Sequence, residues 1–292
     1  MSANGEIELR CGRSRARISP FGAELKSWRV GGRELLWRAD PAIWAQTCPV
    51  LFPVVGWCRA GQIRIDGTSY PMPVHGFASA CMFELETCAD DQAVFLLRDN
   101  TQTRAHYPAA FLLRVAFALR DEDLEVRIRV SNEDARDLYF ACGLHPGFAV
   151  PFAGGAPGDY FVEFEKPEIN LVPVIAEGGL FSRERRAVPL DGRCLRLGPA
   201  LFENEALCFL NCNSSAISMS RPGHGAIAMQ VENLPHFAVW SRPGAPFVSL
   251  EAWSGYGDPE DFCGDISLKP GMRLLEPGNA AEFSAAFSYS DR

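Results

Sequence analysis

The chain has 292 residues, of which 47% are hydrophobic and 22% are charged, and its formal net charge is -8. This acidic balance argues against a nucleic-acid-binding protein, because such proteins neutralise phosphates with basic residues. No run of about 18 or more apolar residues could span a membrane, and the N-terminal sequence lacks the basic and apolar parts of a signal peptide. We therefore expect a cytoplasmic protein with a large core and neither a nucleic-acid nor a membrane partner.

Alternating apolar and polar residues dominate the chain, first at residues 7–11 and 15–18 and again clearly at 124–130. This period of two is typical of strands with one face on a core and the other in water. Turn signals separate such runs at Gly31-Gly32, Asp66-Gly67, Asp191-Gly192, Arg242-Pro243-Gly244 and Pro277-Gly278. The pattern predicts an all-β fold.

Helical patterns are scarce, and the best candidate is a weak, short segment at residues 41–46. The 26 glycines and 21 prolines are scattered along the chain and form no linker. We therefore predict a single domain over residues 1–292. Residues 151–157 are expected to form a long loop, and both a position beside a cleft and a mobile surface insert fit it.

The ten cysteines include no C-x-x-C pair. The closest two, Cys208 and Cys212, have no cluster of histidines beside them. Without an export signal, such cysteines are typically reduced, buried and apolar. We therefore predict neither a disulfide framework nor a bound metal.

Two of the five histidines stand beside backbone breakers at the ends of extended segments. His145 precedes Pro146, which favours extended backbone, and His75 precedes Gly76. Histidine exchanges protons near neutral pH, so the two could converge on one pocket from different strands, although a hydrogen-bonded core or loop-capping role fits each as well. We expect surface or structural roles for the remaining histidines, which are His106, His224 and His236.

Glu251 is the most informative carboxylate. Strand alternation places it on one face with Ser249 and Trp253, in largely apolar company. An acid in such a place is rarely buried without a partner, so it forms either a buried ion pair or a cleft carboxylate tuned for proton transfer. Trp240 and Trp253 offer flat apolar faces that suit a sugar ring or a core equally.

Common catalytic and phosphate-binding motifs are missing from the chain. Neither of the glycine-rich phosphate loops occurs, and neither does the G-x-S-x-G nucleophile elbow. A cleft with two histidines, a carboxylate, an arginine and aromatic walls fits acid–base chemistry on a neutral polyol. Proton transfer is therefore the predicted reaction class.

Four motifs in order resemble the aldose 1-epimerase (galactose mutarotase) family, and most closely its bacterial LacX-like branch. They are Cys-Pro-Val-Leu-Phe-Pro-Val-Val-Gly at 48–56, His-Gly-Phe-Ala at 75–78, Gly-Leu-His-Pro-Gly-Phe at 143–148, and the stretch from Trp240 through Ser-Leu-Glu-Ala-Trp-Ser-Gly at 249–255 to Asp258. The resemblance runs from near residue 7 to near residue 289. It implies one large antiparallel β-sandwich, the supersandwich, and a cofactor-independent reaction at the anomeric carbon of a monosaccharide.

The same resemblance implies a role for each site residue. Glu251 matches the general base that takes the proton of the C1 hydroxyl, and His145 matches the general acid that protonates the ring oxygen. His75 would bind the sugar and help to position its ring, with Trp240 as an aromatic contact. An aspartate common in the family has no clear counterpart, and Glu205 is the candidate.

The chain departs from the family pattern at two cationic positions. Relatives tend to have arginine after the glycine of Phe-Pro-x-x-Gly, where this chain has Trp57, so Arg59 is the candidate sugar-binding arginine, with a surface salt bridge as its alternative. Relatives also often read His-Gly-Phe-Ala-Arg, where this chain has Ser79. Glucose-6-phosphate epimerases need cationic phosphate contacts, so this loss favours an unphosphorylated sugar.

The leading prediction is a hexose 1-epimerase that acts as a monomer or homodimer. The alternatives are a non-catalytic carbohydrate-binding or sensing protein, a hexose-6-phosphate 1-epimerase, and a lyase or hydrolase of sugar polymers. Binding alone does not require an acid and a base around one ring atom, and glycoside hydrolysis normally requires two carboxylates. Only one well-placed acid is evident in the sequence.

Overall fold

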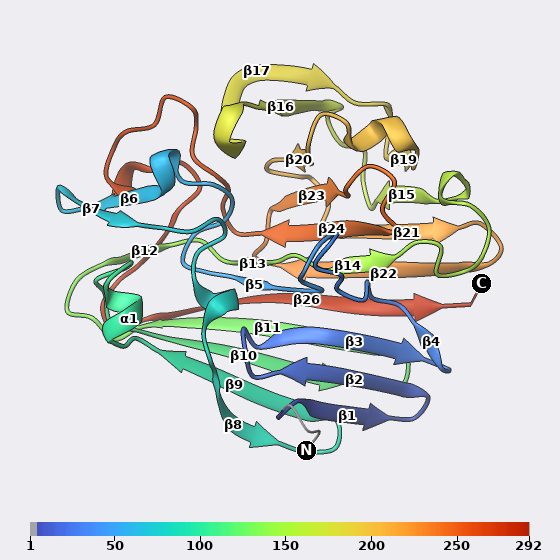
Figure 1. Ribbon diagram of the computed structural model, residues 1–292, viewed down its shortest axis with the longest axis horizontal. Coiled ribbons are helices and arrows are strands. Elements are labelled where there is room, and N and C mark those ends of the chain that lie inside the picture. The colour runs from blue at the N-terminus through green and yellow to red at the C-terminus, as the bar shows by residue number, and fades with distance from the viewer. Residues whose placement is uncertain (1–4, 292) are drawn as a thin grey trace.

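The computed structural model describes residues 5–291, and it consists mainly of antiparallel β-sheets (Figure 1). The largest sheet has ten strands, in the order β18 (Leu190–Asp191), β19 (Cys194–Arg196), β15 (Phe161–Phe164), β21 (Ala216–Arg221), β22 (Gly225–Glu232), β26 (Ala280–Ser290), β11 (Asp123–Asn132), β10 (Phe111–Leu119), β9 (Gln92–Arg98) and β8 (Glu84–Cys88). The predicted domain also includes residues 1–4 and 292, which lie outside the described residues.

Two smaller sheets lie over this large sheet (Figure 1). One contains β1 (Ile7–Cys11), β2 (Ser14–Ser19), β3 (Glu24–Val30) and β4 (Arg33–Glu34). The other runs in the order β20 (Leu207–Phe209), β23 (His236–Trp240), β24 (Phe247–Trp253), β13 (Gly143–Leu144) and β5 (Val50–Leu51), with β14 (Gly147–Ala149) also paired to β24. Three two-stranded sheets complete the fold: the hairpin of β6 (Gln62–Ile65) and β7 (Thr68–Pro71), the pair of β16 (Leu171–Ile175) and β17 (Phe181–Ala187), and the long-range pair of β12 (Leu138–Phe140) and β25 (Arg273–Leu275).

The core fills the space between the layers. Phe287 of the large sheet packs against Trp28 of β3 and Phe148 of β14, with ring centroids 6.3 and 5.9 Å apart. The ring centroids of Phe164 in the large sheet and Phe209 in β20 lie 4.7 Å apart. Full burial of one such side chain stabilises a fold by about 1.5–3 kcal/mol. These contacts confirm the predicted all-β fold and its packing of sheet on sheet.

The alternating segments form strands as predicted, with Leu124, Val126, Ile128 and Val130 of β11 buried in the core. The predicted turns are present too. Positive φ angles occur at Asp66 and at the turn glycines, which are Gly31, Gly32, Gly67, Gly192, Gly244 and Gly278. Among residues 5–291 the only α-helix is α1 (Thr101–Arg104), which begins after the N-capping Asn100. No helix in this range is long and apolar enough to cross a membrane.

The prediction of a helix at residues 41–46 is wrong, because this segment folds into turns. The carboxylate of Asp40 accepts a hydrogen bond from the backbone N–H of Ala42, and its carbonyl accepts from those of Ile43 and Trp44. An aspartate that bonds to the backbone two residues ahead favours a turn over a helix. The indole N–H of Trp37 donates to the carbonyl of Trp44 and holds the turn in place.

Residues 151–157 form a loop as predicted, but this loop does not line the cavity described below. It packs against the far end of the large sheet. The hydroxyl of Tyr160 accepts from the backbone N–H of Ala153, and the guanidinium of Arg221 donates to the carbonyl of Ala153. The loop therefore belongs to the framework of the fold.

Candidate active site

A cavity of about 690 Å³ opens against the six-stranded sheet. The turn between β16 and β17 forms part of its wall, and these two strands lie above β20 and β23 in Figure 1. Several segments contribute polar or aromatic side chains to the lining, namely Trp44, Gln46, Trp57, His75, His145, Glu177, Phe181, Glu205, Trp240, Arg242, Glu251 and Trp253. His75, His145, Glu251, Trp240 and Glu205, all selected from the sequence, thus share one cavity.

The interruption between β13 and β14 places His145 beside β24. Leu144 pairs with Ala252, and Gly147 pairs with Ser249, so His145 and Pro146 lie between two paired stretches. Pro146 has no backbone N–H, but its carbonyl accepts from the N–H of Leu250 and keeps the connection close to the sheet. The imidazole therefore faces the side chains of alternate residues on β24.

His145 and Glu251 are in direct contact at the bottom of the cavity. Nε2 of His145 lies 3.3 Å from Oε1 of Glu251, and the two side chains are only 9% and 3% exposed. The other carboxylate oxygen, Oε2, accepts a hydrogen bond of 3.1 Å from the indole N–H of Trp253. The two groups form a buried, coupled acid–base pair.

Ser249 determines which nitrogen of His145 carries a proton. Its hydroxyl has one hydrogen, and it lies 2.7 Å from the carbonyl of Pro146, to which it donates. The same oxygen lies 2.9 Å from Nδ1 of His145, so it can only accept from Nδ1–H. Nε2 therefore faces Glu251, and one proton occupies the contact between Nε2 and Oε1.

Burial controls the protonation of both members of the pair. Loss of water around Glu251 raises its pKa well above the ordinary value, against a smaller opposing effect of the Trp253 N–H. Burial also lowers the pKa of His145 well below its ordinary value, and the neighbouring His75 lowers it further. Both shifts oppose separated charges, so they favour a neutral carboxylic acid beside a neutral imidazole.

His75 presents a hydrogen-bond donor to the cavity. Its Nδ1 accepts a 3.2 Å hydrogen bond from the backbone N–H of Gly56, so the neutral ring carries its hydrogen on Nε2. Burial lowers the pKa of His75 from 6.5 to about 4. The imidazole rings of His75 and His145 are nearly perpendicular, with centroids 5.5 Å apart.

Gly76 allows the backbone at His75 to approach the neighbouring strand. Both residues have positive φ angles, of 62° and 77°. A Cβ atom on Gly76 would lie 2.1 Å from the carbonyl oxygen of Phe52. This close backbone contact helps to fix the position of the His75 ring.

Aromatic rings form the walls around His145. Trp44 lies 4.8 Å from the imidazole, and Trp240 lies 5.4 Å from it at nearly a right angle. Trp57 is 48% exposed and packs directly on Gly179, whose Cβ position would fall 2.0 Å from the indole. Flat apolar surfaces beside a few convergent polar groups are typical of small-molecule sites.

Several lining residues were not identified from the sequence. The sequence predicts a helix at Trp44 and Gln46, and neither residue belongs to a recognised motif. Ser249 does not itself line the cavity; alternation predicts its place on the face of Glu251, but nothing in the sequence indicates its contact with His145. Arg242, which lies in a predicted turn, is the arginine of this cavity. The one signal for Arg242 in the sequence is that it follows Trp240 by two residues.

Arg59 does not line the cavity, contrary to the expectation for the sugar-binding arginine. Its backbone N–H donates to Oδ2 of Asp258 at 2.8 Å, and its side chain lines a second pocket on the other side of this segment. The chain reverses at Gly56, which has a φ of 73° and lies against Gly257. Trp57 therefore faces the cavity, whereas Arg59, two residues later, faces the second pocket.

The other sequence candidates have peripheral or structural places. Glu205 is exposed at the rim of the cavity. His224 is exposed in a turn, and Nδ1 of His106 lies 2.7 Å from the carbonyl of Pro71. His236 is buried on the face of β23 that also carries Trp240, where its ring lies 5.2 Å from that of Tyr256 and its Nδ1 accepts from the N–H of Asn211. Within residues 5–291, no group of three or more His, Cys, Asp or Glu side chains is placed to hold a metal ion.

Comparisons with known proteins agree with this arrangement. The aldose 1-epimerase family model matches residues 5–288. Protein LacX from Lactococcus lactis subsp. lactis is 28% identical over 93% of this chain and 95% of its own. The crystal structure of a galactose mutarotase related enzyme from Lactobacillus acidophilus is 28% identical and superposes with a TM-score of 0.90, covering 98% of this chain and 97% of the other.

A galactose mutarotase-like protein from Lactobacillus casei ATCC 334 is similar in structure to the same degree. It is 26% identical and has a TM-score of 0.92, and the match covers 98% of this chain and 100% of the other. The fold is therefore galactose mutarotase-like. With the family model spanning nearly the whole length, the chain belongs to the aldose 1-epimerase family.

Proposed function

We propose that this protein is a cofactor-independent aldose 1-epimerase that interconverts the α and β anomers of an unphosphorylated hexose. The observation that supports this most strongly is the buried contact between Nε2 of His145 and Oε1 of Glu251, at 3.3 Å within one cavity. A pair that shares one proton holds an acid and a base at the same time. Anomer exchange requires such a pair, because one proton leaves the sugar while another is added.

Glu251 is the proposed general base and His145 the proposed general acid. With the proton on Nε2, the carboxylate takes the proton of the C1 hydroxyl while the imidazolium protonates the ring oxygen. The bond between C1 and the ring oxygen breaks, and the aldehyde rotates about the C1–C2 bond. Ring closure on the other face returns both protons, so the pair ends with the one proton it began with.

The remaining lining suits the binding of a neutral ring. His75 has Nε2–H available as a donor because Gly56 occupies its Nδ1, and Trp240 and Trp44 offer apolar faces beside His145. Among the described residues, the lining contains one arginine, Arg242, and no lysine. A phosphorylated sugar normally requires several charge-assisted contacts, so an unphosphorylated hexose is the proposed substrate.

The experiment is anomer exchange measured by NMR or polarimetry on freshly dissolved α-glucose, α-galactose and their 6-phosphates. The proposal predicts faster exchange for at least one unphosphorylated sugar. Faster exchange of the 6-phosphates alone would identify a hexose-6-phosphate epimerase. No acceleration with any of the four sugars, together with saturable sugar binding, would identify a non-catalytic binding protein.

A further inference from the structure

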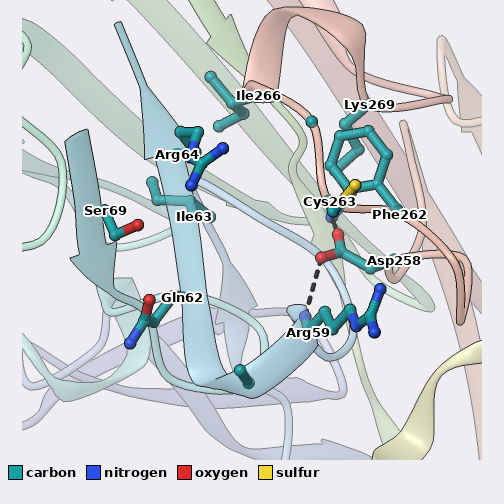
Figure 2. A pocket seen from close by; sticks show the side chains of 12 residues that line it. Arg59, Gln62, Ile63, Arg64, Ser69, Asp258, Phe262, Cys263, Ile266 and Lys269 are labelled. Atoms are coloured by element: carbon teal, nitrogen blue, oxygen red, sulfur yellow. Dashed lines mark hydrogen bonds and ion pairs between the residues drawn. The ribbon is translucent and has the colours of Figure 1, made fainter. Parts of the chain in front are cut away.

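The second pocket, which Arg59 lines, shares no lining residue with the sugar cavity among residues 5–291. It has a volume of about 170 Å³ and lies between the β6–β7 hairpin and the segment from Asp258 to Lys269. Figure 2 shows Arg64, Gln62 and Ser69 on the hairpin side and Lys269 on the opposite side, whereas Arg59 lies next to Asp258 with its guanidinium directed away from Arg64. A water molecule occupies about 30 Å³ in the liquid, so the pocket has room for one tetrahedral oxyanion.

Three cationic side chains and one carboxylate line this pocket. In a chain with a formal net charge of -8, such a local excess of positive charge is unusual. Neither Arg59 nor Arg64 uses its guanidinium in a hydrogen bond or ion pair with any residue of the range 5–291. Some exposed arginines elsewhere, such as Arg98 and Arg136, are paired with carboxylates, whereas the side chains of Arg38 and Arg120 are unpaired among the described residues, as those of Arg59 and Arg64 are.

Lys269 is the buried element of the pocket. Its side chain is 1% exposed, and Nζ lies 2.8 Å from Oδ1 of Asp258, whose side chain is 5% exposed. An ammonium group has three N–H donors, and apart from this ion pair Nζ has no hydrogen-bond partner among the described residues. A buried charged group with unused donors is costly. Nζ has almost no surface open to the pocket, so its positive charge acts on a bound anion through the pocket wall and not through a hydrogen bond.

The hairpin adds neutral donors beside the arginine. Arg64 pairs directly with Ser69 across the two strands, so their side chains lie on the same face. Gln62, two residues before Arg64, lies on that face as well, and all three residues line the pocket. The hairpin therefore supplies a set of donors along one side of the pocket.

We propose that this pocket binds a phosphate group, either as the free ion or as a small phosphate monoester. A phosphate carries a charge of about -1.5 to -2 at pH 7 and offers several acceptor oxygens. The guanidinium of Arg64 can bind this charge directly, with Ser69 and Gln62 as further donors, and Arg59 and the buried ammonium of Lys269 add positive charge around the pocket. Asp258 holds Lys269 in place and leaves an excess of two positive charges for the ligand.

The site is separate from the proposed sugar site, although the two share a wall. The backbone N–H of Asp258 donates to the carbonyl of Trp57, and the carbonyl of Asp258 accepts from the N–H of Phe181. Trp57 and Phe181 face the sugar cavity, whereas the Asp258 side chain faces the second pocket. Phosphate bound here does not compete with a neutral hexose.

The test is titration of the wild-type protein with inorganic phosphate, and separately with methyl phosphate, by calorimetry and by ³¹P NMR. The variants are Arg64→Gln and the double variant Arg59→Gln/Arg64→Gln, which change only exposed side chains and leave the buried ion pair intact. We expect binding to weaken about fivefold in the single variant and about 25-fold in the double variant. Binding of methyl phosphate together with inorganic phosphate supports an ester ligand, and binding of inorganic phosphate alone supports the free ion.

The matched control is Arg242→Gln, which removes an exposed arginine from the sugar cavity. We expect it to bind phosphate as the wild type does. No binding of either probe to the wild type would overturn the proposal. Equal affinity in the double variant, or loss of binding only in Arg242→Gln, would overturn it too, and the second result would place the phosphate in the sugar cavity.

Discussion

Nε2 of His145 lies 3.3 Å from Oε1 of Glu251, and each group has a second fixed partner. Ser249 contacts the other nitrogen of the imidazole, and the indole N–H of Trp253 contacts the other oxygen of the carboxylate. Because Ser249, Glu251 and Trp253 alternate along β24, one strand holds all three on the face toward the cavity. β24 therefore contributes Glu251 to the acid–base pair and also carries Ser249 and Trp253, which orient the two members of the pair.

Ser249→Ala tests whether this orientation matters for the proposed reaction. Removing the hydroxyl releases Nδ1 of His145 from its acceptor, so the ring and its tautomer are less well fixed. We expect kcat for anomer exchange to fall about tenfold, because one hydrogen bond is worth about 0.5–1.5 kcal/mol, while KM changes little. Ser249→Thr keeps the hydroxyl and should restore most of the rate; equal kcat values for the Ala variant and the wild type would contradict the positioning role.

Trp253→Phe tests the hydrogen bond to Glu251. The indole N–H favours the ionised carboxylate and lowers its pKa, so its removal should raise the pKa of Glu251 further. If the carboxylate is the base, the acid side of the kcat/KM profile should move to higher pH. Rates measured from acidic to mildly alkaline pH provide the readout, and a shift toward lower pH would contradict the assignment.

Buried histidines should make the stability of the fold depend on pH. Burial lowers the pKa values of His75 and His236 from 6.5 to about 4. Between these values the unfolded chain binds more protons than the folded one, so the free energy of unfolding should fall as the pH decreases from about 6.5 to 4. Above a pH of about 6.5 this contribution is fully present.

Urea denaturation at several pH values measures this effect. His236→Gln removes one of the two groups without touching the sugar cavity and should flatten the dependence on pH. The exposed His224→Gln variant serves as the control and should leave the slope unchanged. An unaltered slope in His236→Gln would show that its burial does not couple to protonation.

Gly76→Ala should destabilise the protein strongly. The added Cβ would fall 2.1 Å from the carbonyl oxygen of Phe52 at a φ of 77°, so strain and overlap with a backbone atom combine. We expect a loss of about 2 kcal/mol or more in the free energy of unfolding. Gly32→Ala has a similar φ of 84° but open space around the Cβ, so it should cost only about 1 kcal/mol; equal losses in the two variants would argue against the close contact.

Local patterns in the sequence predicted the strands and several of the site residues. Alternation in β11 identifies its buried face because a sheet has a period of two, and Pro146 and Gly76 mark where regular pairing must stop. The ordered motifs of the family supplied the roles of Glu251 and His145. Their meeting in one cavity depends on pairing between distant strands, which periodicity does not encode.

Features that depend on tertiary contacts could not be read from the sequence. Trp44 looked helical, but the turn at Asp40 and the contact with His145 determine its place. Arg59 looked like the missing sugar ligand, but the reversal at Gly56 directs it into the second pocket. Nothing in the sequence around Lys269 indicates that its ammonium is buried against Asp258.

The most direct test of the central proposal is anomer exchange by Glu251→Gln and His145→Asn on a sugar that the wild type converts. Each variant removes one member of the proton-transferring pair, and the side-chain amide introduced by Glu251→Gln can still accept from Trp253. We predict that each loses about 10²–10⁴-fold in rate while its melting temperature shows that the fold is retained, and that His236→Gln, which lacks a histidine outside the cavity, keeps the wild-type rate. A wild-type rate in either Glu251→Gln or His145→Asn would contradict the proposed mechanism.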